Sequence, residues 1–214
     1  EKMNGSLTYI LIALIAYALG NINPAIIIGK LHGIDIRKEG SGNAGMTNTI
    51  RVIGLWAGIV VFAVDILKAF IAVRAGIHIA HSYSGGLVAF AFVVLGHCYP
   101  ALYKFKGGKG VAASLGAALA LNWQSALAAA AIAGILFLIS GKRMSVASLG
   151  AAVSYPFLLW HFMPERYCVI FAVVMVLFLM VQHIANIRRI AKGEEEALTV
   201  GHADSKDNEG KEEE

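Results

Sequence analysis

Charge is scarce in this 214-residue chain, and what there is lies unevenly. Only 15% of the residues are Asp, Glu, Lys or Arg, whereas soluble domains carry about 25%. Acids are rarest before residue 193, where 5 acids stand against 16 bases and give a net charge of +11. This shortage of charge excludes an ordinary soluble domain for residues 1–192.

Cysteine is almost absent as well. Cys98 and Cys168 are too few for a disulfide framework, and their spacing matches no metal site. We interpret both as small buried apolar residues, and we expect neither a bound metal nor a covalent cysteine nucleophile.

Long apolar runs occupy most of the chain instead. Residues 9–29, 52–73, 87–95, 111–139 and 169–181 contain very little charge, and a bilayer requires about 20 apolar residues for each spanning helix. A secretory signal followed by a soluble domain would explain only the first run. The sequence therefore predicts an all-α integral membrane protein.

Basic residues gather in four places, at 30–51, 104–109, 142–143 and 188–192. Short loops rich in Lys and Arg stay in the cytoplasm, so an even number of helices must separate consecutive clusters. Two helices fit into each interval, although the interval 110–141 must then break near Asn122 into two short helices. One further helix precedes the first cluster. This count predicts seven transmembrane helices, with the N-terminus outside and the C-terminus in the cytoplasm.

We expect residues 1–192 to form a single seven-helix domain without room for a soluble domain. Residues 193–214 contain nine acids and few apolar residues, a composition typical of disorder. We assign no function to this tail, so any chemistry must lie in the loops and at the helix ends.

The first basic loop is rich in glycine. Gly40, Gly42 and Gly45 permit positive φ and close backbone approach, and consecutive amides in such a loop can bind an anion. A helix follows, and its N-terminus favours negative charge. Arg51 adds a planar donor that suits phosphate.

The second basic loop contains Lys104, Lys106 and Lys109 with Gly107, Gly108 and Gly110, directly before an apolar helix. This pattern indicates a second anion site, although it lacks the Walker A signature. A basic loop that binds lipid headgroups and sets the topology explains the same composition. The presence of two such loops on one face favours a site for anionic substrates.

Polar residues near two other helix ends complete the candidates. Ser145 and Ser148 follow the third basic cluster, where helix capping alone would explain them. His183 and Asn186 are three residues apart and share a helix face. Asp65 and Lys68 lie inside an apolar run, and we interpret them as a mutual ion pair that orients their helix.

Three motifs in this order resemble one family. Gly-Ser-Gly-Asn-x-Gly-x-Thr-Asn-x-x-Arg at 40–51, Gly-His-x-x-Pro…Phe-Lys-Gly-Gly-Lys-Gly-Val-Ala at 96–112, and His-x-x-Asn-Ile-Arg at 183–188 resemble the bacterial acyl-phosphate:glycerol-3-phosphate acyltransferases. The resemblance implies a seven-helix enzyme of the bacterial cytoplasmic (inner) membrane, active on the cytoplasmic face. Such an enzyme transfers a fatty acyl group from acyl phosphate to the 1-hydroxyl of glycerol 3-phosphate. Lysophosphatidic acid and phosphate are then the products, and neither coenzyme A, a metal nor another cofactor is needed.

The resemblance also implies roles for residues on these motifs. The catalytic set is His183, Asn186, Ser148 and Lys109. The residues that bind substrate phosphate are Ser41, Gly42, Asn43, Gly45, Thr47, Asn48, Arg51, His97, Lys104, Lys106, Gly107 and Gly108. Within this set, Lys104 and Lys106 would steer anions toward the site.

The group that accepts the hydroxyl proton stays open between two alternatives. His183 has a reference pKa of about 6.5 and suits a general base. A substrate phosphate, with a second pKa near 6, would serve equally in a substrate-assisted reaction, which we favour.

Two other classes of function share some of these features. A transporter or flippase for a phosphate-bearing solute would also need basic loops, but it should contain an internal repeat, and none is seen. A lipid-anchored scaffold would tolerate loss of Lys109 or Arg51. The expected partners are the two substrates, membrane lipid and an enzyme that supplies acyl phosphate, and no nucleic acid.

Overall fold

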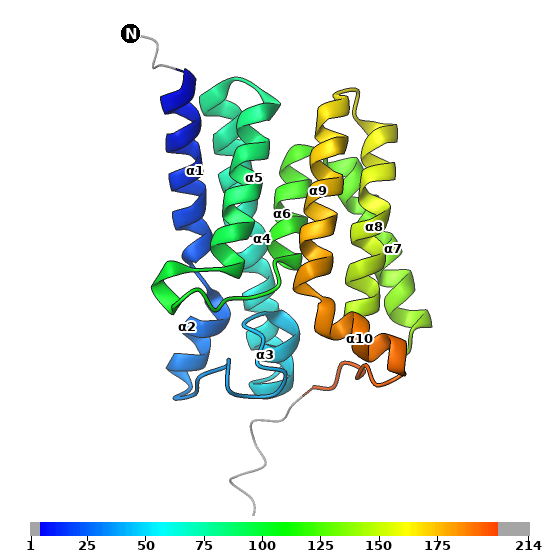
Figure 1. The fold of residues 1–214 in the computed structure, drawn as a ribbon. Coiled ribbons are helices and arrows are strands. Elements are labelled where there is room, and N and C mark those ends of the chain that lie inside the picture. The colour runs from blue at the N-terminus through cyan, green and yellow to red at the C-terminus, as the bar shows by residue number, and fades with distance from the viewer. Residues whose placement is uncertain (1–4, 201–214) are drawn as a thin grey trace, which may run out of the picture.

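The structure is a computed structural model that describes residues 5–200, and within that range it contains helices and no strands (Figure 1). The helices, in chain order, are α1 (Gly5–Asn21), α2 (Pro24–Leu31), α3 (Met46–Val52), α4 (Leu55–Ala80), α5 (Tyr83–Cys98), the 3-10 turn η1 (Ala101–Tyr103), α6 (Val111–Leu121), α7 (Trp123–Ile139), α8 (Met144–Phe162), α9 (Arg166–Gln182) and α10 (Ile184–Lys192). Most of the acidic tail, residues 201–214, lies outside the described residues.

Seven of these helices match the seven that the sequence predicts, namely α1 and α4 to α9. The predicted break near Asn122 is confirmed, because Asn122 ends α6 and its side-chain oxygen caps α7 by accepting from the backbone of Ser125 at 2.9 Å. Three segments are long and apolar enough to cross a bilayer: Gly5–Leu31, Leu55–Ala80 and Tyr83–Tyr103. The pair α9 and α10, bent by 66°, adds a fourth at most. Crossing by all seven therefore stays a prediction.

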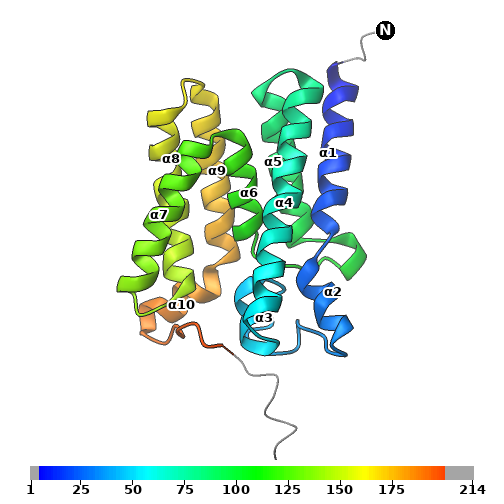
Figure 2. The same ribbon diagram turned by 180° about the vertical axis from the view of Figure 1, so that it is seen from behind.

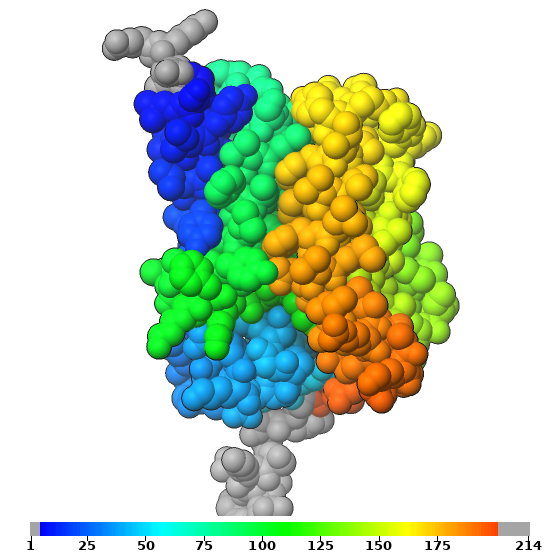
Figure 3. All heavy atoms as spheres, in the orientation of Figure 1, coloured from blue at the N-terminus to red at the C-terminus, as the bar shows by residue number. Residues whose placement is uncertain are grey.

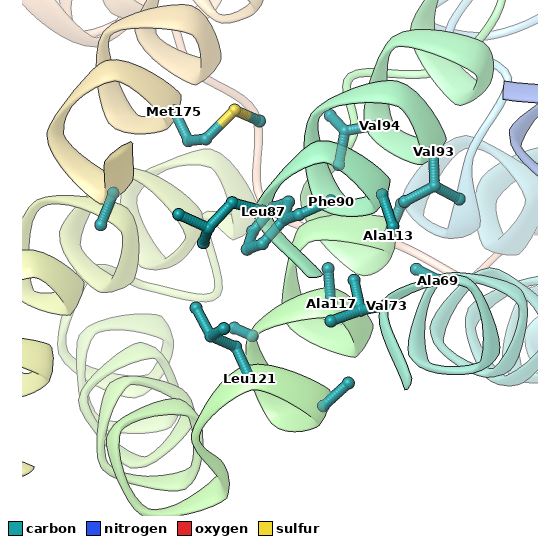
Figure 4. Close-up of a cluster of buried hydrophobic side chains, with 14 of the residues drawn as sticks. Ala69, Val73, Leu87, Phe90, Val93, Val94, Ala113, Ala117, Leu121 and Met175 are labelled. Carbon is teal, nitrogen blue, oxygen red and sulfur yellow. The ribbon is translucent and has the colours of Figure 1, made fainter. Parts of the chain in front are cut away.

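The helices form two groups joined by α6. Helix α5 packs on α1 and α4, while α8 packs on α7 and α9, and α6 contacts α4, α5 and α7 (Figures 1 and 2). Between the groups, side chains from α4, α5, α6 and α9 meet in a buried apolar cluster (Figure 4). Its labelled members are Ala69, Val73, Leu87, Phe90, Val93, Val94, Ala113, Ala117, Leu121 and Met175.

The four basic clusters lie at the same end of the molecule. Helices α2, α3 and α10 and the loop between α5 and α6 are all found there, opposite the end at which α1 begins (Figure 1). The outward faces of the helices between the two ends carry exposed apolar side chains, among them Leu14 (63%), Phe157 (75%) and Ile170 (68%). Water would not favour such a surface, whereas lipid does. The described chain therefore has the surface of an integral membrane protein with one basic end.

Glycines allow the closest helix contacts. A Cβ added to Gly85 of α5 would collide with the carbonyl oxygen of Gly76 in α4 and with Ala80. Gly134 of α7, by contrast, has no atom within 4 Å of the place where its Cβ would lie. The two glycines therefore form a matched pair, one in a tight helix contact and one in open space.

We expect Gly85→Ala to lower the midpoint of thermal unfolding in detergent, because overpacking costs about 1–3 kcal/mol. Gly134→Ala should leave it unchanged or raise it, since alanine in a helix interior is better than glycine by about 0.5–1 kcal/mol. Equal midpoints for the two variants would contradict the close contact between α4 and α5.

Candidate active site

The glycine-rich first loop is organised by one buried side chain, Asn48. Its Oδ1 accepts hydrogen bonds from the backbone N and the Oγ of Ser41, at 2.8 and 3.1 Å. Its Nδ2 donates to the carbonyls of Ile36 and Glu39, both at 3.0 Å. Gly42, with φ of 71°, turns the chain within this loop. Asn48 therefore holds the loop through hydrogen bonds and does not line the cavity, although the sequence suggested that it binds phosphate directly.

The second loop lies flat against the end of α5. The backbone nitrogens of Gly107 and Gly108 donate to the carbonyls of Cys98 and His97, at 3.1 and 3.2 Å. A Cβ on Gly108 would collide with the ring of His97. Only glycine permits this close approach, and it places the next residue, Lys109, just before α6.

The two loops meet at a polar cavity of about 240 Å³. It opens between α3, α4, α6, α8 and α10. Nine of the predicted residues line it: Ser41, Asn43, Gly45, Thr47, Arg51, His97, Lys109, Ser148 and Asn186.

Three cations surround this cavity. Lys109 donates to Oδ1 of Asn186, and burial, followed by the charges of Arg189 and Arg51, lowers the pKa of Lys109. The Nε of Arg51 is buried and has no hydrogen-bond partner among the described residues. A buried unpaired donor beside two further cations favours an anion as the ligand.

Glu195 was missed by the sequence reasoning, which treated the whole segment from residue 193 as disordered. The structure instead buries its side chain, which is 8% exposed, at the edge of the cavity. One carboxylate oxygen accepts from Ser145 at 2.6 Å and Asn186 at 2.7 Å, and the other accepts from Arg189 at 2.7 Å. Glu195 is held there because Ser145 of α8 and Asn186 of α10 are buried donors, and each needs an acceptor.

The hydrogen bonds of Glu195 also set its charge. Burial alone would raise the pKa of this carboxyl, but the bonds from Ser145, Asn186 and Arg189 outweigh burial and hold the pKa below its usual range. Glu195 is therefore ionised at neutral pH. The only hint in the sequence was its position just after the basic end of α10.

Seven predicted residues do not line the cavity. Gly42, Asn48, Gly107 and Gly108 support the loops, as described above, and Lys104 and Lys106 are exposed outside it. His183 is buried at the bend between α9 and α10. Its Nδ1 lies 2.8 Å from the carbonyl of Leu179 and must carry a proton to bond there. The structure thus places this predicted catalytic residue outside the cavity lining, to which Asn186 belongs.

The predicted ion pair inside α4 is confirmed and belongs to a larger cluster. Lys68 Nζ lies 2.8 Å from Asp65 Oδ1 and 3.1 Å from Nδ1 of His97. It also donates to the carbonyls of Gly20 and Ile22, where α1 ends. The cluster joins α1, α4 and α5 below the cavity, which Asp65 and His97 line.

A second cavity, also about 240 Å³, continues from the first between α6, α7, α8 and α9. The two share Phe62, Val111, Met144 and Ser148. The second is lined mainly by alanines and other apolar side chains, with the buried, unpaired hydroxyls of Ser114 and Tyr155 as exceptions. An anion site that opens into an apolar cavity fits a ligand with a charged head and a hydrocarbon chain.

Comparison with known families agrees with this chemistry. A family model described as glycerol-3-phosphate acyltransferase matches residues 10–193. A glycerol-3-phosphate acyltransferase of Thermoanaerobacter sp. (strain X514) is 39% identical over 190 residues, which cover 88% of this chain and 95% of the relative. That of Prochlorococcus marinus (strain MIT 9312) is 35% identical over 192 residues, covering 88% and 97%.

Two solved structures share the fold. Both are crystal structures of PlsY (YgiH), an integral membrane glycerol 3-phosphate acyltransferase, each 33% identical to this chain. The glycerol 3-phosphate form has a TM-score of 0.83 and covers 89% of this chain and 96% of that one. The lysophosphatidic acid form has a TM-score of 0.80, with coverages of 88% and 94%.

We expect Glu195→Gln to lower both activity and thermal stability, because Arg189 loses its ionised partner and such bonds contribute about 1.5–3 kcal/mol. The stabilisation from Glu195 is complete above the ordinary carboxyl pKa and is lost as the pH falls through the lowered value. The difference in unfolding midpoint between the variant and the unchanged protein should therefore shrink in acid.

Glu194→Gln is the matched control, since Glu194 is exposed and its substitution removes the same charge. Equal effects of the two substitutions would contradict a specific role for Glu195. So would a rise in activity on Glu195→Gln, because the carboxylate would then be competing with substrate.

Proposed function

The chain belongs to the glycerol-3-phosphate acyltransferase family, and we propose on this premise that it transfers a fatty acyl group from acyl phosphate to the 1-hydroxyl of glycerol 3-phosphate. It is a membrane acyltransferase that acts on glycerol 3-phosphate in phospholipid biosynthesis. In our proposal the products are lysophosphatidic acid and inorganic phosphate.

The junction of the two cavities carries this proposal. Arg51, Lys109 and Arg189 provide cations for phosphate groups in the polar cavity, and the apolar cavity has the lining that a fatty chain requires. Ser148 borders both cavities. The acyl carbonyl would therefore lie near Ser148, with the donor phosphate toward the cations and the chain toward α7.

The reaction needs few groups from the protein. The 1-hydroxyl oxygen attacks the acyl carbon, the new C–O bond forms, the bond from that carbon to the phosphate oxygen breaks, and phosphate leaves with the bonding electrons. Lys109 and Arg51 would stabilise the charge on the phosphates, and the hydroxyl of Ser148 and the amide of Asn186 would orient the reactants. Because acyl phosphate has a good leaving group, no covalent enzyme intermediate is required.

A substrate phosphate is the proposed acceptor of the hydroxyl proton. His183 does not line the cavity. Its Nδ1 donates to Leu179, so only Nε2 is left to accept a proton. A dianionic phosphate held beside the hydroxyl, by contrast, needs no protein base. His183 then acts by holding the bend that presents Asn186.

We further propose seven spanning helices in a bacterial inner membrane, with the polar cavity on the cytoplasmic face. The one basic end and the opposite location of the start of α1 support this orientation. Acyl phosphate would be supplied by a separate enzyme. A transporter for a phosphate-bearing solute is the alternative function, but no observation of the structure favours it.

The proposed donor is tested by incubating purified protein with glycerol 3-phosphate and one of three donors: acyl phosphate, acyl coenzyme A, or acyl carrier protein loaded with a fatty acyl group. We expect equal amounts of lysophosphatidic acid and phosphate with acyl phosphate and no product with the other two. Product from acyl coenzyme A alone would overturn the donor. Transport of glycerol 3-phosphate into vesicles without acylation would favour the transporter.

Two substitutions separate the alternatives for the proton acceptor. Lys109→Gln should reduce kcat/KM more than about hundredfold, as expected for a group that stabilises transition-state charge. His183→Ala should lower kcat/KM less than about hundredfold. Loss of a general base would cost more, typically about 10²–10⁴-fold. A larger loss for His183→Ala, with an unchanged unfolding midpoint and a lost acidic limb in the pH profile, would assign the base to His183.

A further inference from the structure

Residues 100–106, between α5 and α6, are the part of the predicted anion site that the cavity does not use. We call this segment the lateral loop. It projects sideways from the bundle beside α1 and α2 (green in Figures 1 and 3). Lys104 and Lys106 lie on it, exposed and outside the cavity lining.

The depth of the lateral loop follows from the length of α5. The 16 residues of α5 span about 24 Å at 1.5 Å per residue, less than the ~30 Å hydrocarbon core of a bilayer. The apolar stretch reaches the required length only when it is counted through the loop as Tyr83–Tyr103, 21 residues. The loop therefore lies at the boundary between the acyl chains and the headgroups.

The side chains of the lateral loop suit that boundary. Leu102 is 75% exposed and Phe105 is 60% exposed, although both are large and apolar. Lys104 and Lys106 flank Phe105. Apolar side chains next to lysines are the composition of segments that insert into a membrane surface.

The backbone of the lateral loop is strained at two of these exposed residues. Lys104 and Phe105 have φ of 57° and 58°, in the left-handed region that bulky residues rarely adopt. Such strain persists only where the surrounding structure imposes it. The chain turns at these two residues, and the side chains of both are exposed.

Contacts with α1 and the first loop hold the lateral loop in place. Asn21 accepts from the backbone of Leu102 at 3.3 Å, and Arg37 donates to the carbonyl of Tyr103 at 3.1 Å. Lys30 lies 5.4 Å from the centre of the Tyr103 ring. These contacts hold the backbone of the loop from within the protein, whereas the side chains of Leu102, Lys104, Phe105 and Lys106 are exposed.

No carboxylate among residues 5–200 forms an ion pair with Lys104 or Lys106. Asp35, an acid at the same end of the molecule, is bonded to Arg37 at 2.8 and 3.0 Å. We propose that the lateral loop is a binding surface for anionic lipid headgroups, with Lys104 and Lys106 on the lipid phosphate and with Leu102 and Phe105 among the first carbons of the chains. The proposal does not rest on the acyltransferase reaction.

Lipid binding tests the proposal directly. Purified protein would be placed in vesicles of phosphatidylcholine containing spin-labelled phosphatidylglycerol, and the relative affinity for the labelled lipid measured. Lys104→Gln with Lys106→Gln should weaken the preference for phosphatidylglycerol by about fivefold per lysine, the equivalent of about 1 kcal/mol for each cation near an anionic surface. Lys142→Gln with Lys192→Gln removes the same charge elsewhere on the basic end and should change it less than half as much. An equal loss for both pairs would overturn the proposal.

The depth of the loop gives a second readout that does not depend on the lysines. Both native cysteines are buried, so a spin label on Phe105→Cys reports that position alone. We expect the label to be more accessible to oxygen than to a water-soluble relaxation agent, as at the acyl–headgroup boundary. Accessibility equal to that of a label on the exposed residue Lys192→Cys would overturn the proposal.

The lysines could act on substrate instead, and kinetics in lipid-free detergent separates the two roles. A surface for lipid headgroups predicts the same KM for glycerol 3-phosphate in the double variant and in the unchanged protein. A KM raised severalfold in both detergent and vesicles would assign Lys104 and Lys106 to substrate capture and would overturn the proposal.

Discussion

Repulsion among three partly buried cations is the constraint on which the site depends. Arg51, Lys109 and Arg189 come from separate segments, and each loses hydration where the segments meet. Part of that charge is compensated, because Glu195 accepts from Arg189, Asn186 accepts from Lys109, and Glu196 lies 3.6 Å from Arg51. The Nε of Arg51 still has no hydrogen-bond partner among the described residues. A phosphate would complete the compensation. The same arrangement that is costly when empty therefore provides the binding energy for an anionic substrate.

The rest of the fold holds these cations in position against their repulsion. Asn48 shapes the first loop, and Gly107 and Gly108 let the second loop lie against α5. The cluster of Asp65, Lys68 and His97 joins the middle of α4 to the ends of α1 and α5. The chain from α10 returns across the cavity with Glu195. Ser148, together with Phe62, Val111 and Met144, lines both cavities and marks the change from the polar to the apolar one. The boundary between the two cavities is thus also the boundary between charged and hydrocarbon parts of the proposed donor.

Patterning predicts the helices and the shared basic end, because long apolar runs and Lys/Arg clusters are properties of composition. It predicts the nine cavity residues less directly, through motifs whose loops happen to face one another. It does not show which way a side chain in a loop points, and so it gave no sign that Lys104 is exposed or that Nδ1 of His183 bonds to Leu179. Glu195 was missed because composition averages over the whole tail, whereas its partner Ser145 lies 50 residues away in the chain.

The location of a bound product tests the account most directly. A structure determined with lysophosphatidic acid should show its phosphate within hydrogen-bond distance of Arg51 and Lys109, and its chain between α6, α7, α8 and α9. A phosphate bound at Lys104 and Lys106, or a chain lying along the outer surface of α1 and α5, would contradict the two joined cavities as the active site.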